Sequence, residues 1–243
     1  YTTLFRSTPN VALMYKPGKF NFRASYAAGF RTPTLSELYA TDIAKKNDRL
    51  TIGNLDLKPE KNNYFSLSAE YVHERFSVSV NAFYNNIRDM IDYNTIATGD
   101  KAMEQYGHKE VRQRDNIAEA KVHGINVSAN AYLGAGFNLS GGYTHLNTQD
   151  VELEQPIDKS IKNAYNINAQ WAHSWKIYRL NINLNGRINS KRFSKSYGYA
   201  PEYQLWNLNT RHSFNLKSVI IEPGCGMENL FDYMDDRPRS EER

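Results

Sequence analysis

The chain has 243 residues, of which 13% are aromatic and 40% hydrophobic, and its formal net charge is +4. No window approaches the roughly 18 consecutive apolar residues of a spanning helix, which excludes a helical membrane bundle. The first residues show no signal-peptide pattern, so either the protein is cytoplasmic or the start of the gene is missing. Spread-out Lys and Arg argue against nucleic acid as a partner, and the single cysteine, Cys225, excludes an internal disulfide.

Period-two alternation of apolar and polar residues is the organising signal of the sequence. From residue 20 to residue 30, Phe, Tyr and Ala recur on one face, whereas the other face carries Asn, Arg and Ser. This pattern predicts an all-β protein built as an antiparallel meander. About ten strands are expected, at residues 10–16, 20–30, 63–72, 76–87, 118–133, 137–147, 163–175, 177–188, 203–216 and 219–230.

The connections between these strands alternate in length. Tight turns occur at residues 17–19, 73–75, 134–136, 176 and 217–218. Long segments occur at residues 31–62, 88–117, 148–162, 189–202 and from 231 onward. In an antiparallel meander every second connection lies at the same end of the sheet, so the short turns gather at one end and the long segments at the other. Short turns at one end and long loops at the other are typical of an outer-membrane barrel rather than of a soluble sandwich.

Side-chain chemistry favours the same reading. A Lys or Arg on the lipid face near the bilayer midplane costs about 2 to 4 kcal/mol, and the apolar register has none in mid-strand, since Arg23 and Glu70 fall on the polar register. Aromatic residues recur near strand ends, as interfacial girdles require. They are Phe20, Phe30, Tyr71, Phe76, Tyr84, Trp171, Trp175 and Trp206.

Five phrases of the sequence carry a family resemblance. "GFRTPTLSELY", "GNLDLKPEKNNYFSLSAEY", "FSVSVNAFYNNIRDMIDY", "NIAEAKVHGINVSANAYL" and "GMENLFD" follow one another in order. They resemble the C-terminal barrel segments of TonB-dependent outer-membrane receptors. The motif residues are Phe30, Arg31, Pro33, Leu35, Glu37, Asn54, Asp56, Leu57, Pro59, Glu60, Asn229, Leu230 and Phe231.

The resemblance implies a barrel of about 22 strands with an N-terminal plug, in the outer membrane of a Gram-negative bacterium. Residues 1–243 are then expected to be a partial C-terminal half of this barrel, without the plug and the final strand. "FDYMDDRPRSEER" is interpreted as a charged loop and "YTTLFRSTPN" as the tail of an earlier strand or loop.

Active uptake is the function that the resemblance implies. The ligand would be a scarce small molecule such as a siderophore, cobalamin or haem. The implied partners are TonB with its inner-membrane energising complex, reached through the absent N-terminus, and outer-membrane lipid; a surface lipoprotein is a further candidate. No catalytic residue, cofactor or bound metal is expected.

Haem is disfavoured within this class. Residues 30–33 and 54–57 resemble paired motifs of haem receptors, which usually carry a ligand histidine between them. Residues 33–53 contain no histidine, although imidazole is the usual axial ligand. His108, in the long loop, is the one histidine placed clearly outward.

The ligand-binding candidates come from two segments. Thr34 and Glu37 have capping-box spacing for a short helix from Leu35, so part of the first segment shapes the loop. In the second, basic and aromatic side chains suit an anionic or aromatic chelate. The candidates are Arg31, Glu37 and Tyr39 in the first, and Tyr106, His108, Lys109, Arg112 and Arg114 in the second.

Three alternatives remain open. A passive porin would lack the plug and the coupling segment, and a soluble sandwich lectin would express without detergent. A barrel hydrolase would use His108, His145, His173 or His212, yet no nucleophile motif accompanies them. Calcium binding by Asp150, Glu152, Glu154 and Asp158 is chemically open, although their spacing matches no calcium loop.

Overall fold

The computed structural model describes residues 8–194 and 198–234. Residues 1–7 and 235–243 lie outside it, so most of the expected N-terminal tail and part of the expected C-terminal loop are not described. The same holds for residues 195–197 of the expected loop 189–202.

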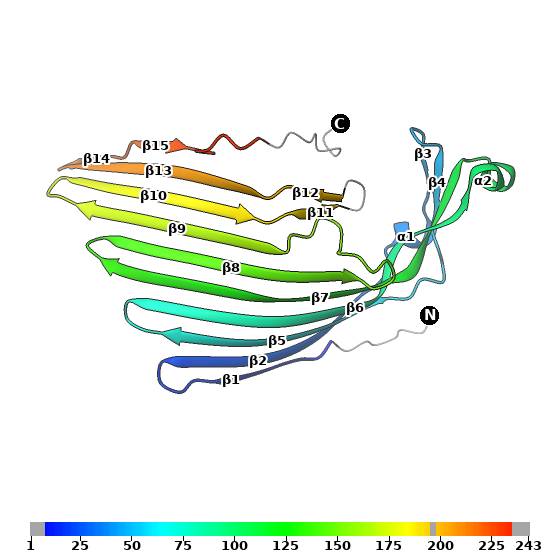
Figure 1. Cartoon of the computed structure of the whole chain (residues 1–243), viewed down its shortest axis with the longest axis horizontal. Helices are drawn as coiled ribbons and strands as arrows, with labels where there is room; N and C mark the ends of the chain where they lie inside the picture. Colours follow the sequence, from blue (N-terminus) through cyan, green and yellow to red (C-terminus); the bar gives the residue numbers. More distant parts are fainter. Residues whose placement is uncertain (1–7, 195–197, 235–243) are drawn as a thin grey trace.

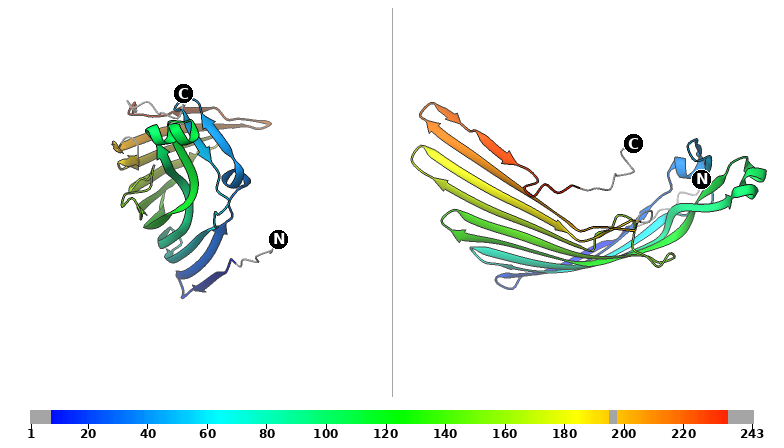
Figure 2. Two further views of the ribbon diagram at one scale, coloured as in Figure 1. Left: turned by 90° about the vertical axis from the view of Figure 1, so that its right-hand side faces the viewer. Right: turned by 45° about the horizontal axis from the view of Figure 1, so that its top comes forward.

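The chain folds into a large antiparallel meander, which confirms the predicted fold class. The long strands pair in the order β1-β2-β5-β6-β7-β8-β9-β10-β13-β14, and the sheet is bowed into an open trough (Figures 1 and 2). The strands of this path, with β15 beside β13, are β1 (Asn10–Tyr15), β2 (Phe20–Arg31), β5 (Glu60–Val72), β6 (Phe76–Thr98), β7 (Glu110–Gly134), β8 (Phe137–Asp150), β9 (Asn163–Ser174), β10 (Tyr178–Asn189), β13 (Tyr203–Leu216), β14 (Val219–Ile221) and β15 (Gly224–Met227).

The two ends of the sheet differ as the connection lengths predict. Short turns join the long strands at one end, and the small elements gather toward the other, which we call the long-loop end (Figure 1). Neither helix in the described residues is long or apolar enough to cross a membrane. The small elements are α1 (Leu35–Tyr39), β3 (Thr41–Ala44), β4 (Arg49–Ile52), α2 (Gly99–Tyr106), β11 (Arg192–Ser194) and β12 (Gly198–Ala200).

The prediction of a loop over residues 88–117 was wrong. Most of this segment is strand, because β6 and β7 continue beyond the ends of the other long strands and are joined there by α2. Register shifts interrupt the β6–β7 pairing between Ile87 and Met90 and between Thr95 and Ala97. Such bulges break the period-two alternation from which the strands were read.

The last predicted strand, 219–230, is also shorter and interrupted. β14 and β15 both pair with β13 in one continuous register, with Ile221 opposite Phe214 and Gly224 opposite Arg211. Pro223 lies between them, and proline has no N–H to donate to the ladder. Its carbonyl still accepts from the His212 amide at 2.9 Å.

The strand registers place the polar side chains on one face. Asn21 donates to Glu70 at 2.9 Å, and Ser25 bonds Ser66 at 2.6 Å across β2 and β5. Arg23 lies opposite Ser68 on the same face. The predicted register is therefore present in the structure.

The other face of the sheet is apolar and exposed. Phe22, Phe65, Leu67 and Ile125 are 40%, 49%, 63% and 44% exposed. Along β2, ten residues separate Phe20 from Phe30. At about 3.3 Å per residue and a tilt of about 40°, this spacing corresponds to roughly 25 Å, which matches the apolar band of a membrane barrel.

Candidate functional site

The candidate site begins where the chain leaves β2. Pro33 disfavours helix at the preceding residue, and α1 follows at once. The Thr34 hydroxyl accepts from the Glu37 amide at 3.2 Å, and the Glu37 carboxylate accepts from the Thr34 amide at 2.8 Å. This reciprocal pair confirms the predicted capping box.

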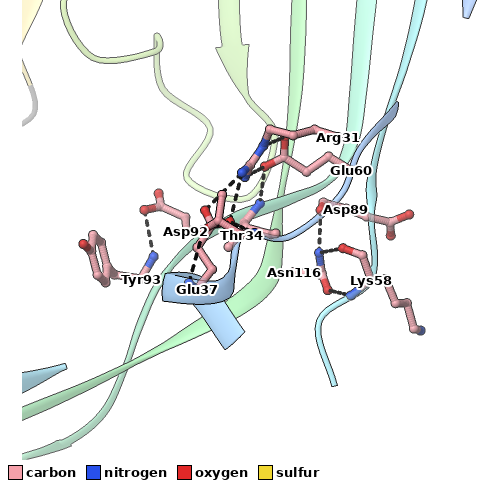
Figure 3. A network of polar contacts seen from close by, with 10 residues as sticks. Arg31, Thr34, Glu37, Lys58, Glu60, Asp89, Asp92, Tyr93 and Asn116 are labelled. Atoms are coloured by element: carbon pink, nitrogen blue, oxygen red, sulfur yellow. Dashed lines mark hydrogen bonds and ion pairs between the residues drawn. The ribbon is translucent and has the colours of Figure 1, made fainter. Parts of the chain in front are cut away.

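Arg31 joins three elements at this corner (Figure 3). Its Nε and Nη2 donate to the two carboxylate oxygens of Glu60 at 2.7 and 2.6 Å. Its Nη1 donates to Glu37 at 2.9 Å. Glu60 also accepts from the Ile91 amide at 2.9 Å. We call Arg31, Glu37 and Glu60 the clasp. It ties α1 to the ends of β2 and β5 and to β6.

The clasp keeps Glu37 ionised. Partial burial raises the pKa of this carboxyl, but hydrogen bonds from Arg31 and from the Thr34 amide outweigh it, so the pKa lies below its ordinary value. The clasp carries two carboxylates and one guanidinium, and Arg31 is therefore engaged within the protein.

The segment after β4 docks directly on α1. The Gly53 amide donates to Ala40 O at 2.8 Å, and the Asn54 amide donates to Glu37 O at 3.0 Å. A Cβ at Gly53 would lie 2.5 Å from the Leu38 carbonyl oxygen. Only glycine permits this approach, which gives a physical reason for the glycine that opens "GNLDLKPE".

Asn116 holds the same segment against the long strands (Figure 3). Its side-chain oxygen accepts from the Lys58 amide at 2.6 Å, and its amide donates to Lys58 O at 2.9 Å and to Asp89 O at 2.6 Å. Leu57 is buried beside it, at 9% exposure. Asn116 was missed from the sequence, because nothing in "RDNIAEA" marks an asparagine that satisfies a distant backbone.

A small lobe rises beyond the sheet at the long-loop end (Figure 2). β4 pairs in parallel with β7, and β3 pairs with β4. Buried Leu50, Ala102 and Val111 form its core, with Tyr106 packed against them. Tyr106 thus packs against the core of the lobe, whereas the sequence predicted it only as a ligand-binding candidate in a loop.

His108 fixes the position of this lobe. Its Nδ1 lies 2.9 Å from Asp48 Oδ1, and the Lys109 amide donates to the Asp48 carbonyl at 3.0 Å. The hydrogen bond with His108 is the main influence that holds the pKa of Asp48 below its usual value. His108 and the Lys109 backbone therefore join the β3–β4 turn to the start of β7.

The two predicted arginines of this segment differ in their partners. Arg112 Nε donates to Glu110 at 2.5 Å. Arg114 instead lies 3.6 Å over the ring centroid of Tyr93 and donates to its hydroxyl at 2.5 Å. None of the ion pairs found in residues 8–194 and 198–234 includes Arg114. Tyr93 was not among the predicted site residues, because its pairing with Arg114 follows from the β6–β7 register.

Other predicted residues have exposed side chains or lie elsewhere in the sheet. Tyr39 and Leu35 are 67% and 77% exposed, and Lys109 is also exposed. Asn229 caps its own turn by bonds with the Tyr233 backbone at 2.9 Å. Phe231 packs edge-on against Trp206, with centroids 6.5 Å apart. These last contacts lie on the β13 edge of the sheet.

The residues considered for catalysis or metal binding are not assembled. His145 bonds Asn163 at 2.8 Å, and His212 bonds the Tyr178 hydroxyl at 2.7 Å, while His173 stacks on Trp171. Asp150 accepts from the Leu153 amide at 3.2 Å within a turn. Among the described residues, no three His, Cys, Asp or Glu side chains are grouped to hold a metal ion.

These features define the class of protein. A bowed antiparallel meander with an apolar outer band, a polar opposite face and unequal ends is the wall of a membrane β-barrel. Residues 1–226 match the family model described as TonB dependent receptor-like, beta-barrel. The chain belongs to this family, whose members are outer-membrane proteins of Gram-negative bacteria.

Solved structures and a curated relative agree with this assignment. A variant of the ferric enterobactin receptor from Pseudomonas aeruginosa is 19% identical, with a TM-score of 0.74 over 93% of this chain and 35% of its own. The ferric preacinetobactin receptor from Acinetobacter baumannii is 18% identical, with a TM-score of 0.65 over 92% and 32%. A probable hemoglobin and hemoglobin-haptoglobin-binding protein from Haemophilus influenzae is 28% identical over 134 residues.

The compared proteins are much longer than this chain. It spans about a third of the solved receptors. The matched part is 51% of this chain and 13% of the curated relative's length.

Proposed function

We propose that this chain is part of a receptor that takes up a scarce ligand actively across the outer membrane. The observation that carries the proposal is the set of contacts at the long-loop end, where the clasp, the Asn116 hydrogen bonds and the core of the lobe join segments of residues 31–116 to one another. A preorganised surface of this kind binds a ligand at low entropic cost. TonB and its energising complex would act through a plug carried elsewhere in the receptor.

The barrel itself is proposed to be larger than this sheet. β1 and the β14–β15 line form its two edges, and they do not pair with each other in the described residues. Unpaired backbone groups cost several kcal/mol each, in order of magnitude, within hydrocarbon. Residues 1–243 would therefore supply a C-terminal part of a barrel of about 22 strands, closed by further strands.

The proposed ligand is an anionic metal chelate. Arg31 and Arg112 are paired with carboxylates, whereas Arg114 lies over the ring of Tyr93 and belongs to none of the ion pairs found among the described residues. A guanidinium fixed over an aromatic ring offers charge and stacking area together. The solved relatives described above as receptors for ferric enterobactin and preacinetobactin support this ligand class.

Haem taken from haemoglobin is the second candidate. It is favoured by the printed description of the Haemophilus influenzae relative. Against it, His108 is bound to Asp48, and no histidine lies between residues 33 and 53. The haem route would therefore need an axial ligand from another part of the receptor.

A ligand panel tests the proposal. The intact receptor would be produced in a Gram-negative host without its own iron-chelate receptors, and growth would be scored on ferric enterobactin, haem, haemoglobin and cobalamin. For the chelate that is used, Arg114→Gln should weaken binding by about tenfold, the loss of one charge-assisted hydrogen bond. Arg75→Gln, in a short turn, is the matched control. Equal affinity of the Arg114 variant and the control would contradict the assignment.

Growth on haem or haemoglobin alone would favour the second candidate. Ester or peptide hydrolysis that disappears in His108→Ala would instead identify an enzyme.

A further inference from the structure

The short-turn end of the sheet carries an unbalanced positive charge. Its turns in the described part of the chain contain one carboxylate, that of Glu74. Across the same residues, the ion pairs found join side chains at the long-loop end, and none involves a turn cation. The turn cations are Lys16, Lys19, Arg75, Lys176 and Lys217.

Two of these cations sit on adjacent turns. Lys176 lies in the β9–β10 turn and Lys217 in the β13–β14 turn. The turns are joined directly, because the Asn215 amide donates to Ile177 O at 2.8 Å. β10 and β13 pair up to Tyr178 and Phe214 at this end. The two lysines are therefore neighbours across one strand pair.

Aromatic side chains line the apolar face immediately beside these turns. Trp175 and Tyr178 stack with centroids 5.3 Å apart, and Tyr178 and Phe214 lie 4.9 Å apart. The Tyr178 hydroxyl bonds His212 Nδ1 at 2.7 Å. This arrangement gives a polar edge, made by the phenol and the imidazole, on an otherwise apolar surface.

Apolar side chains project around the same corner. Trp175, Ile177 and Val219 are 50%, 59% and 57% exposed. Exposure of these apolar side chains to water would be unfavourable, but the same side chains suit the boundary between lipid headgroups and acyl chains. The long stems of the two lysines can follow this surface while their charges reach the headgroup level.

We propose that the corner formed by Lys176, Tyr178, His212 and Lys217 binds the headgroup of an anionic phospholipid in the membrane leaflet at the short-turn end. The two ammonium groups would pair with the lipid phosphate, as basic groups beside a membrane do. The Tyr178–His212 pair would offer hydrogen bonds to the glycerol region. Trp175, Ile177 and Val219 would contact the acyl chains.

Native mass spectrometry of the intact receptor in detergent tests this site. Phosphatidylglycerol and phosphatidylethanolamine would be titrated separately, without ligand or TonB, so the outcome does not depend on uptake. The variant is Lys176→Gln with Lys217→Gln. The matched control is Lys45→Gln with Lys46→Gln, an equally exposed pair in the turn between β3 and β4. Heat-modifiable migration on a denaturing gel would verify that each barrel is folded.

The unmodified receptor should retain phosphatidylglycerol in preference to phosphatidylethanolamine. Each lysine should contribute about fivefold, so the double variant should bind phosphatidylglycerol about twenty-five-fold more weakly, whereas the control should be unchanged. Raised salt should reduce the preference. Equal retention of the two lipids, or an unchanged double variant, would overturn the proposal.

Discussion

Arg31 grips both carboxylate oxygens of Glu60, with Nε–Oε2 at 2.7 Å and Nη2–Oε1 at 2.6 Å. The two residues are 29 positions apart and lie opposite each other, at the last position of β2 and the first position of β5. With Glu37 as third member, the pair fixes the exit of β2, the helix α1 and the start of β5. The "GFRTPTLSELY" motif therefore shapes the rim of the barrel at the long-loop end.

Breaking the clasp should loosen this rim without unfolding the barrel. Arg31→Gln removes both ion pairs, and we expect local opening of residues 35–57 to become easier by about 1 kcal/mol, a low figure because the arginine side chain is 44% exposed. Hydrogen exchange at the Leu38 and Ala40 amides measures it. Lys61→Gln, which removes the single-contact pair with Asp89, is the control. Unchanged exchange rates in Arg31→Gln would show that the clasp does not stabilise residues 35–57 against local opening.

The clasp should also respond to acid. Because the folded-state pKa of Glu37 is lowered, its contribution to stability is present above the ordinary Glu pKa of about 4.3. It is lost as pH falls through the lower, folded-state pKa. Protection of the α1 amides should therefore be constant from pH 7 to pH 5 and fall below about pH 4. In Glu37→Gln this acid-dependent step should be smaller, because Glu60, whose pKa Arg31 also lowers, is the carboxylate of the clasp that still titrates. A step of unchanged size in Glu37→Gln would contradict the assignment.

Gly53 should tolerate no side chain. In Gly53→Ala the new methyl group would meet the Leu38 carbonyl at 2.5 Å, so the docking of residues 53–54 on α1 should weaken by about 1 to 3 kcal/mol. Faster exchange of the Gly53-site and Asn54 amides would report this. Gly29→Ala is the control, since its Cβ would meet nothing closer than 4.0 Å. If the two variants gave the same amide exchange rates, the close approach of residue 53 to the Leu38 carbonyl would not limit the side chain at this position.

The membrane register makes a separate prediction. Phe22→Lys places an ammonium group in the apolar band and should cost about 2 to 4 kcal/mol, so assembly in the outer membrane should fall. Ser25→Lys, on the polar face where Ser25 bonds Ser66, should assemble normally. The amount of heat-modifiable barrel in outer-membrane fractions measures both. Equal amounts would reverse the assignment of the two faces.

Much of this fold was readable from local patterns. Strands such as β2 and β9 carry strict alternation, and the capping box of Thr34 and Glu37 is a short-range signal. The continuation of β6 and β7 was not readable, because bulges near Ile87 and Thr95 shift the register. A pattern method assigns such segments to loops.

The site was predicted less completely than the fold. Arg31 and Arg114 were chosen for their charge, but their roles depend on partners far along the chain. Arg31 forms an ion pair with Glu60, whereas Arg114 lies over the ring of Tyr93 and has no ion pair in the part of the chain that the structure describes. Asn116 acts through bonds to the backbones of Lys58 and Asp89. Such pairings follow from strand register rather than from motif spacing.

Energised uptake is the central claim, and radiolabelled iron accumulation in whole cells tests it most directly. Cells with the intact receptor would be given ferric enterobactin, with and without a protonophore and with and without TonB. We expect saturable accumulation that requires both the proton gradient and TonB. Accumulation that persists both without the proton gradient and without TonB would identify a passive porin and contradict energised uptake.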